Sequence, residues 1–401
     1  MKGLLFAGTE NAVWVSFDNG DHWQSLQQNL PHTSMRDLWI HNDDLLVGTH
    51  GRSFWVLDDI SPLRQMAAAA NASVFLFKPA PAYRVRRDTY TDTPLPPDEP
   101  AGQNPPDGAV IDYVLGEAAT GPVTLEILDA AGKPLRRFSS DDKPAFTLES
   151  LRQTLSIPIY WVRMPRVPSG APGMHRFVWD LRETPPQASE YGYPISAIPH
   201  DTPREPAGPL VLPGQYTVRL TAEGRILTAP LKVVMDPRVS TPAAGLRKQH
   251  EVETRLAAIM NESFEARAEL TGLDHELETL SRQANGSLAE VVSALRTKLT
   301  ALAGSRGGRF ATRSTRETLP RVAGEVGGLY GQVGGADAAP TATQMTALAA
   351  VEKDYATVMT RWNAIKSTDL PALNRQLSGA GLPEIKLKAE PAPASESENE
   401  E

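Results

Sequence analysis

The chain has 401 residues, a formal net charge of −8 and no cysteine. This length predicts two or three domains of roughly 100–200 residues each. The lack of cysteine excludes disulfide bonds and thiolate metal sites. A large share of the negative charge lies in the last twelve residues, at Glu390, Glu396, Glu398, Glu400 and Glu401. The rest of the chain is close to neutral, which argues against a nucleic-acid-binding protein.

The sequence contains no stretch near the ~18 apolar residues that a membrane-spanning helix needs. The apolar run Leu4–Ala7 ends at Gly8 and is too short for a signal peptide. We therefore expect it to belong to a strand.

Residues 1–65 are rich in short apolar runs with no helical period between them. Gly8, Gly20 and Gly51 supply turns between these runs. The predicted strands are Leu4–Ala7, Ala12–Phe17, Arg36–Ile40, Leu45–Thr49 and Ser53–Leu57. Their close spacing is typical of up-and-down antiparallel sheets such as propeller blades.

Residues 66–107 are expected to connect this region to a second one. They hold a short helical turn at Ala67–Ala70, a strand at Val74–Phe77 and a proline-rich loop at 94–106. Residues 108–236 return to short strands and predict a β-sandwich. Its predicted strands are Val110–Leu115, Val123–Leu128, Leu135–Phe138, His175–Asp180, Gln215–Thr221 and Leu231–Met235. The proline-rich stretch 185–213 is expected to cover a face or edge of that sandwich.

Residues 237–388 change to a helical period and predict an antiparallel bundle of three or four helices. Thr241 is the expected N-cap of the first helix, with Pro242 at its first position. Further helices are expected at Leu288–Leu302, Ser314–Val333 and Thr341–Lys366. The acidic tail 389–401 is expected to be disordered.

One motif carries the most specific information. Ser16, Asp18, Gly20 and Trp23 fit the Asp-box pattern Ser/Thr-x-Asp-x-Gly-x-x-Trp between two predicted strands. The Asp carboxylate can accept backbone N–H groups in the turn, and Gly20 can take a positive φ. Trp23 can then pack over the hairpin. Asp18 is therefore interpreted as structural and not as a catalytic acid.

With this motif, the chain resembles the C-terminal part of bacterial BNR/Asp-box repeat proteins, which are sortilin-like and glycosyl-hydrolase-like β-propellers. The segment 48–60 is similar to the one that closes the propeller in that group. The middle region resembles an FlgD-type immunoglobulin-like domain in the segments 123–132, 175–181 and 213–218. The resemblance implies a multidomain β plus α chain with a partial propeller, an immunoglobulin-like sandwich and a helical bundle. Residues 1–65 supply about two blades, whereas closure usually needs four or more. The chain is therefore expected to be part of a longer, exported protein.

The candidate ligand-binding residues are His50 and Arg52, which flank Gly51 at a strand end and can bind an anionic group. A hydrogen-bonded loop is the interpretation favoured over ligand binding for these two residues. Asp58 and Asp59 are adjacent carboxylates, but neighbouring strand residues point to opposite faces, so we do not expect them to act on one bond.

Other chemical signals in the sequence are weak. His22, His32 and His41 are too scattered for a metal site, and no cofactor fingerprint is present. Trp179-Asp180 is interpreted as packing at a sandwich edge. For Trp161, Tyr191 and Tyr193, anchoring of loops is favoured over stacking on sugar rings. The glycine-rich segment 304–309 is interpreted as an interhelix loop. It lacks the Gly-Lys-Ser/Thr ending of a phosphate-binding loop.

The leading hypothesis is a non-catalytic binding or assembly region of an exported Asp-box propeller protein that contacts protein or glycan. The alternative is a fragment of a glycoside hydrolase whose active site lies mainly in upstream blades. A third hypothesis is a homo-oligomer in which partial propellers from several chains close a ring. Unpaired strand edges in two isolated blades would favour aggregation.

Overall fold

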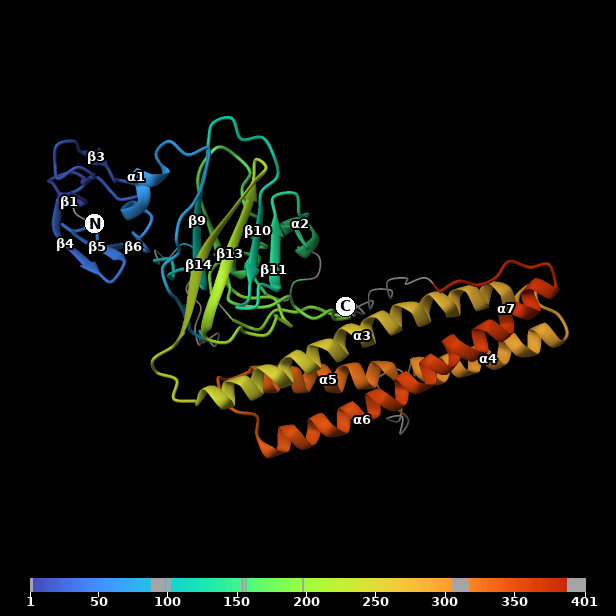
Figure 1. Ribbon diagram of the computed structural model, residues 1–401. Coiled ribbons are helices and arrows are strands. Elements are labelled where there is room, and N and C mark those ends of the chain that lie inside the picture. The colour runs from blue at the N-terminus through green and yellow to red at the C-terminus, as the bar shows by residue number, and fades with distance from the viewer. Residues whose placement is uncertain are drawn as a thin grey trace. The chain divides into compact units, whose positions relative to one another are not determined.

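The computed structural model describes residues 3–87, 98, 102–152, 155, 157–196, 198–304 and 317–387. It shows a mixed β plus α chain that divides into two compact units (Figure 1). The strand-rich unit comprises residues up to Thr184, Tyr193–Pro203 and Leu210–Ser240. The helical unit comprises Pro185–Gly192, Arg204–Pro209 and the residues from Thr241 on. The predicted tail 389–401 and most of the predicted loop 94–106 lie outside the described residues.

The strand-rich unit begins with two small antiparallel sheets that match the strands predicted for residues 1–65. The first sheet contains β1 (Leu5–Gly8), β2 (Val13–Ser16) and β3 (Gln24–Ser25), in that order. The second contains β4 (Met35–His41), β5 (Asp44–Thr49) and β6 (Phe54–Leu57), also in chain order. Each sheet is therefore a three-stranded meander.

The two meanders share one apolar core. Val13 and Val15 of β2 and Leu45 and Val47 of β5 are all at most 3% exposed within it. The first strands of the two sheets are close to each other, since the backbone N–H of Met35 donates to the Thr9 carbonyl at 2.9 Å. Alternation along each strand thus places one face of each sheet against the other sheet.

A 3₁₀ turn at Leu63–Gln65 and the short helix α1 (Met66–Ala69) follow, as predicted for this stretch. The next strands form a five-stranded sheet and a three-stranded sheet around one core. The five-stranded sheet has the order β11 (Pro134–Ser139), β10 (Thr124–Leu128), β13 (Gly214–Ala222), β14 (Arg225–Met235) and β8 (Ala82–Arg84). The three-stranded sheet has the order β12 (Gly173–Trp179), β9 (Ala109–Leu115) and β7 (Val74–Leu76).

The predicted strands between 108 and 236 are all present, with two differences. β14 begins six residues before its predicted start, and β8, which was not predicted, pairs with its end in parallel. Tyr113 and Trp179 are both fully buried in this core. A short helix α2 (Leu148–Leu151) and a 3₁₀ turn at Ile159–Trp161 lie in the connection before β12.

The helical unit packs its helices around a second large core. The helices are α3 (Ala243–Ser281), α4 (Ser287–Ala303), α5 (Leu319–Gly334), α6 (Ala342–Ala364) and α7 (Leu370–Gly379). A π-helical turn at Ile365–Asp369 joins the last two. Because Pro371 has no N–H to offer to the fourth residue before it, this wider turn replaces a regular one.

One predicted helix start needs correction, and another lies outside the described residues. Thr241 does not cap α3, because Pro242 occupies that position and the Thr241 hydroxyl donates to the Asp337 carbonyl at 2.6 Å. In the described residues the third helix begins at Leu319, with Pro320 in its first turn, and the predicted start at Ser314 lies outside the described residues. Proline suits this position because its missing N–H has no partner in the first turn of a helix.

The proline-rich stretch 185–213 stays only in part with the strand-rich unit, to which its pieces Tyr193–Pro203 and the residues from Leu210 on belong. Two of its pieces, Pro185–Gly192 and Arg204–Pro209, belong to the helical unit. They pair with each other through two backbone hydrogen bonds of 2.9 Å between Gly192 and Glu205. Within the helical unit, the Tyr330 hydroxyl donates to the Ala207 carbonyl at 2.6 Å.

Candidate interaction surface

The Asp-box turn is held by its own side chains. The Ser16 hydroxyl donates to the Asp18 carboxylate at 2.8 Å and accepts the Gly20 backbone N–H at 2.8 Å. Asp18 also accepts the backbone N–H of His22 at 2.9 Å and contacts the His22 ring nitrogen Nδ1 at 2.6 Å. The backbone bond from His22, followed by the His22 and Ser16 side chains, lowers the pKa of Asp18 to about 2. The carboxylate is thus fully engaged within its own turn.

The turn also positions Trp23. Gly20 has a φ of +101°, and a Cβ built on it would lie 3.6 Å from both the Trp23 ring and the Leu5 side chain. Trp23 and Leu5 therefore both lie against Gly20, and they stay 40% and 41% exposed. Trp14 of β2, which points away from the shared core, is half-buried. We call Leu5, Trp14 and Trp23 the first outer face.

The second sheet has an apolar face that is turned away from the shared core. In its ladder, Trp39 is paired with Leu46 and Leu46 with Val56, while Phe54 is paired with Gly48. Trp39 is 62% exposed, Phe54 86% and Val56 53%. We call Trp39, Leu46, Phe54 and Val56 the second outer face. Each of these four side chains is at least 36% exposed, so none is buried by the described part of the chain.

The predicted ligand residues lie at one end of this sheet. The His50 ring accepts a hydrogen bond from the Arg36 guanidinium at 3.3 Å, and its backbone carbonyl accepts the Thr33 hydroxyl. Arg52 uses its backbone to bond Thr49, and its side chain is exposed. The structure thus brings Arg36 and His50 together, while Arg52 lies in the exposed turn between β5 and β6.

Asp58 and Asp59 take part in a turn that is anchored to the larger sheets. The Asp59 carboxylate accepts the Ser61 N–H, and Asp44 accepts the Asp59 N–H, each at 2.9 Å. Burial and the nearby Asp44 carboxylate raise the pKa of Asp58. The carbonyls of Asp58 and Asp59 both accept the Arg176 guanidinium. These contacts favour the structural interpretation of the two aspartates.

A second set of ion pairs connects loops of the strand-rich unit. Arg163 bonds Asp107 at 2.6 Å and Asp201 at 2.8 Å, and Arg87 and Arg166 approach the same carboxylates at 3.5–3.6 Å. Arg163 and Asp201 are each only 16% exposed. Both carboxylates thus have arginine partners. The ion pairs connect four segments of the chain, at Arg87, Asp107, Arg163–Arg166 and Asp201.

The aromatic residues singled out from the sequence have structural contacts. Trp179 is fully buried at the end of the edge strand β12, and its indole N–H donates to the Arg182 carbonyl in the loop that follows. Trp161 is 9% exposed in a small apolar cluster, and Tyr193 packs edge-on against Phe146. Tyr191 donates its hydroxyl to the Pro186 carbonyl.

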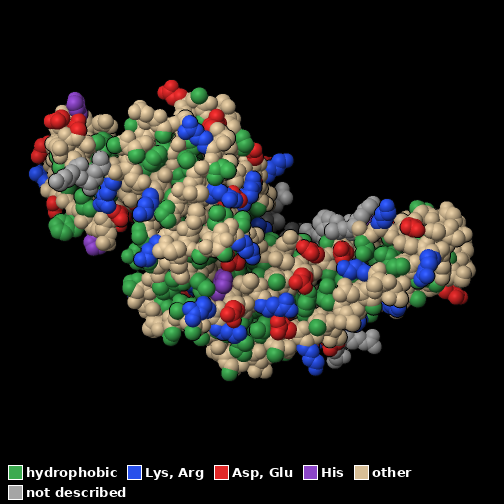
Figure 2. Space-filling model, viewed as in Figure 1, with side chains coloured by type: hydrophobic (Ala, Val, Ile, Leu, Met, Phe, Trp, Pro, Cys, Tyr) green, Lys and Arg blue, Asp and Glu red, His purple; other side chains and the backbone are tan. Residues whose placement is uncertain are grey.

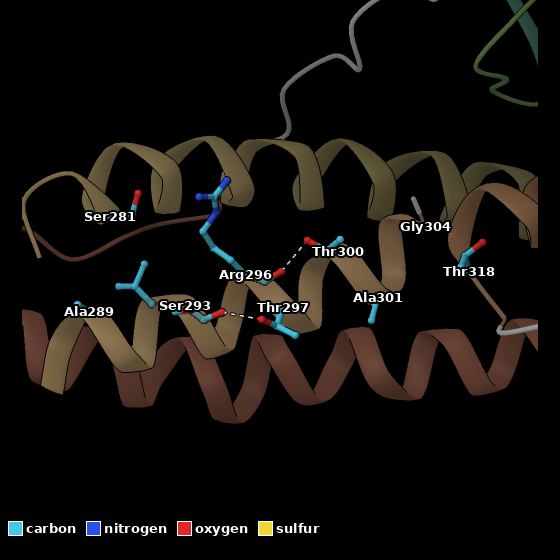
Figure 3. A pocket seen from close by; sticks show the side chains of 10 residues that line it. Ser281, Ala289, Ser293, Arg296, Thr297, Thr300, Ala301, Gly304 and Thr318 are labelled. Atoms are coloured by element: carbon cyan, nitrogen blue, oxygen red, sulfur yellow. Dashed lines mark hydrogen bonds between the residues drawn. The ribbon is translucent and has the colours of Figure 1, made fainter. Parts of the chain in front are cut away.

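The helical unit carries a surface groove of about 730 Å³ among α3, α4 and the start of α5 (Figure 3). Thr297 and Thr300, which line it, donate their hydroxyls to Ser293 and Arg296 of their own helix, each at 2.9 Å. Arg296 approaches Asp274 at 3.4 Å. The two hydroxyls are thus bonded to backbone carbonyls of α4, and Arg296 faces a carboxylate of α3. In the predicted glycine-rich loop 304–309, residues from 305 on lie outside the described chain.

Exposed large apolar side chains concentrate in the two small sheets. Among the described residues, seven of the thirteen such side chains lie before residue 58, and none lies in α3–α7. Figure 2 shows charged and hydrophobic side chains on the visible surface of both units. An exposed contiguous apolar patch is the usual mark of an interaction site.

Comparison with known proteins gives no significant match to any family model, curated protein or solved structure. The resemblance to Asp-box propeller proteins therefore stays a prediction. The described residues contain no group of three or more His, Asp or Glu side chains placed to hold a metal ion. They also contain no helix with the length and apolar character needed to cross a bilayer.

The second outer face was not identified from the sequence, although a signal for it is present. In Leu38-Trp39-Ile40, Leu45-Leu46-Val47 and Phe54-Trp55-Val56-Leu57, neighbouring residues are all apolar. Since neighbours point to opposite faces of a sheet, such runs indicate strands that are covered on both sides.

Proposed function

We propose that this chain is a non-catalytic binding or assembly region of an Asp-box propeller protein, and that the second outer face is its docking surface for a protein partner. The observation that carries the proposal is the exposure of Trp39, Phe54 and Val56 on one sheet face. Burying two aromatic rings and two aliphatic side chains provides the apolar centre that protein interfaces use.

The arrangement of the two small sheets supports the propeller part of the proposal. Each is an up-and-down meander, they pack face to face, and their first strands β1 and β4 are neighbours. Neighbouring blades of a propeller have the same three properties. A blade at the end of such a row carries one apolar face without a neighbour, as the second sheet does.

Arg36, His50 and Arg52 add a polar rim to this docking surface. They lie at one end of the second sheet, and interface rims are polar and solvent-accessible. The predicted ligand residues thus take part in partner binding without forming an enclosed pocket. In the ladder, Leu46 and Val56 lie beside Trp39, while Asp37, which is paired with Gly48, places one carboxylate on the same face. This mainly apolar face favours a protein partner over a sugar.

Site-specific photocrosslinking tests the proposal. The full chain carries benzoylphenylalanine in place of Phe54, and a control chain carries it in place of Ile226, which is 67% exposed on β14. We expect irradiation in an extract of the source cells to give one defined protein adduct from position 54 and none from position 226. The adduct should disappear when Trp39→Ser is added.

Mass spectrometry then identifies the partner, and its affinity for the purified chain is measured with and without Phe54→Ser. Equal labelling from both positions, or no adduct from either, would contradict the docking surface. Binding of the unmodified chain to a glycan array, lost in Phe54→Ser, would replace the protein partner with a carbohydrate.

A further inference from the structure

The strand-rich unit has two apolar outer faces, on opposite sides of the pair of small sheets. The first outer face comprises Leu5, Trp14 and Trp23, and the second comprises Trp39, Leu46, Phe54 and Val56. Each faces away from the core that the two sheets share. One copy of the chain cannot bring these two faces into contact with each other, because its own two sheets lie between them.

We infer that the first outer face of one copy binds the second outer face of the next copy, so that the chain assembles head to tail. This inference rests on the proposed docking function of the second outer face and names its partner, a second copy of this chain. The contact joins two different surfaces, and such heterologous contacts produce closed rings or open filaments.

The shared core inside each copy is a precedent for this contact. There, a face of the first sheet already packs on a face of the second sheet, with Val13 and Val15 against Leu45 and Val47. The proposed contact also joins a first sheet to a second sheet, but the two sheets come from different copies. Each uses its outer face instead of the face that packs in the shared core.

The area of the second outer face suits an interface between copies. Taking about 200 Å² for a fully exposed aromatic side chain, Trp39 and Phe54 together expose roughly 300 Å². Leu46 and Val56 add to this patch. A stable interface buries about 800 Å² on each partner, of which somewhat more than half is apolar. The face thus supplies most of the apolar centre of such an interface.

The first outer face provides a rigid counterpart. The Asp-box bonds fix the turn that holds Gly20, and Trp23 and Leu5 lie against that glycine. A held tryptophan loses little side-chain freedom on binding, so its burial contributes more net affinity. On this inference the Asp-box turn has a role in assembly, because it presents Trp23 at the contact.

Light scattering after size-exclusion chromatography tests the inference with the full chain at several concentrations. We expect the unmodified chain to reach two or more times the monomer mass of 43.5 kDa. Phe54→Ser, which changes the second face, and Trp23→Ser, which changes the first, should each weaken self-association at least about tenfold. Ile226→Ser is the control, since it removes an apolar side chain that is 67% exposed elsewhere, and should assemble as the unmodified chain does.

Mixing the two variants distinguishes a head-to-tail contact from a symmetric one. Phe54→Ser chains keep an intact first face, and Trp23→Ser chains keep an intact second face. We therefore expect each variant alone to be monomeric. In the mixture, the intact first face of one variant can bind the intact second face of the other, so we expect one-to-one dimers. If Trp23→Ser impairs folding, as judged by circular dichroism, Leu5→Ser takes its place.

Three outcomes would overturn the inference: a monomer at every concentration, a mixture that does not dimerise, or loss of assembly in Ile226→Ser. A monomer that still gives the position-54 crosslink to another protein would refute self-assembly alone. The docking surface would then stand with a different partner. A monomer without any crosslink would refute both proposals.

Discussion

Arg176 and Asp112 lie directly opposite each other on the antiparallel strands β12 and β9, and their side chains form a two-pronged ion pair. The two hydrogen bonds measure 3.0 and 3.1 Å, and Asp112 is 3% exposed. The same guanidinium donates to the carbonyls of Asp58 and Asp59, so one arginine connects the small sheets to the larger core of the strand-rich unit.

Arg176→Ala is expected to lower the free energy of unfolding by about 3 kcal/mol, because it leaves a buried carboxylate without its cation. Arg137→Ala is the control, since Arg137 forms an exposed ion pair with Asp142 and its loss should cost less than about 1 kcal/mol. Urea unfolding measures both variants. A loss for Arg176→Ala no larger than that for Arg137→Ala would show that the pair is not important for stability.

The cost of removing Arg176 should depend on pH. Burial raises the pKa of Asp112, and the bond from Arg176 opposes that rise, so the pKa rises further in Arg176→Ala. A carboxyl whose pKa is raised by folding stabilises the fold below its unfolded value and loses that contribution as pH rises through its folded value. We therefore expect a smaller difference between variant and unmodified chain at pH 4 than at pH 7. Equal differences at the two pH values would argue against an unpaired Asp112 carboxylate as the cause.

The Asp-box carboxyl should titrate far below its ordinary range. Carbon-13 chemical shifts of the Asp18 carboxyl are expected to give a pKa of about 2. His22→Ala should raise this pKa only in part, because the backbone N–H of residue 22 still donates to Asp18. Since folding lowers this pKa, its contribution to stability is present above about pH 4 and is lost as pH falls toward 2. An Asp18 pKa near its ordinary value of 3.8 would mean that the turn is not formed as described.

Gly108 should tolerate no side chain. Its φ is +132°, and a Cβ there would lie 1.9 Å from the carbonyl oxygen of Trp179. Gly108→Ala is expected to destabilise the strand-rich unit by at least about 3 kcal/mol. Gly132→Ala shares a positive φ but meets no atom within 4 Å, so it should cost only about 1–2 kcal/mol. Thermal unfolding separates the two, and similar losses would exclude the clash.

Tyr113 should ionise late. Burial raises its pKa to about 12, and its hydroxyl donates to the Ser169 carbonyl at 2.7 Å. Because folding raises this pKa, its contribution to stability is present below about pH 10 and is lost as pH rises toward 12. In an alkaline titration that follows the absorbance of tyrosinate, Tyr113→Phe should remove one ionisation step near pH 12. Tyr216→Phe should remove another, since burial raises its pKa to about 12 too. If the absorbance change near pH 12 is the same in both variants as in the unmodified chain, the raised pKa values of Tyr113 and Tyr216 would be contradicted.

Much of the fold could be predicted because its signals are local. Short apolar runs between turn residues located the strands of residues 1–65, and the three- and four-residue spacing of leucines located α3 and α4. The Asp-box turn is equally local, since Ser16, Asp18 and His22 bond within one hairpin.

The parts that sequence reasoning missed depend on distant partners. β8 has only three residues and exists through parallel pairing with β14, about 150 residues later. Thr241 had the right chemistry for a cap, but its hydroxyl bonds Asp337 instead. For the second outer face, the apolar runs carry a local signal of strands covered on both sides, but they do not say which side packs inside the chain and which stays exposed.

The path of the chain through residues 185–213 has a consequence for any attempt to separate the two units. Since Pro185–Gly192 and Arg204–Pro209 belong with the helices, cutting the gene at residue 240 would leave the helices without pieces of their own surface. Tyr330 would lose its acceptor at Ala207, and Asn261 would lose the Gln187 N–H that it accepts. Neither unit is therefore one continuous segment of the sequence, so neither could be moved intact into another gene by a single cut.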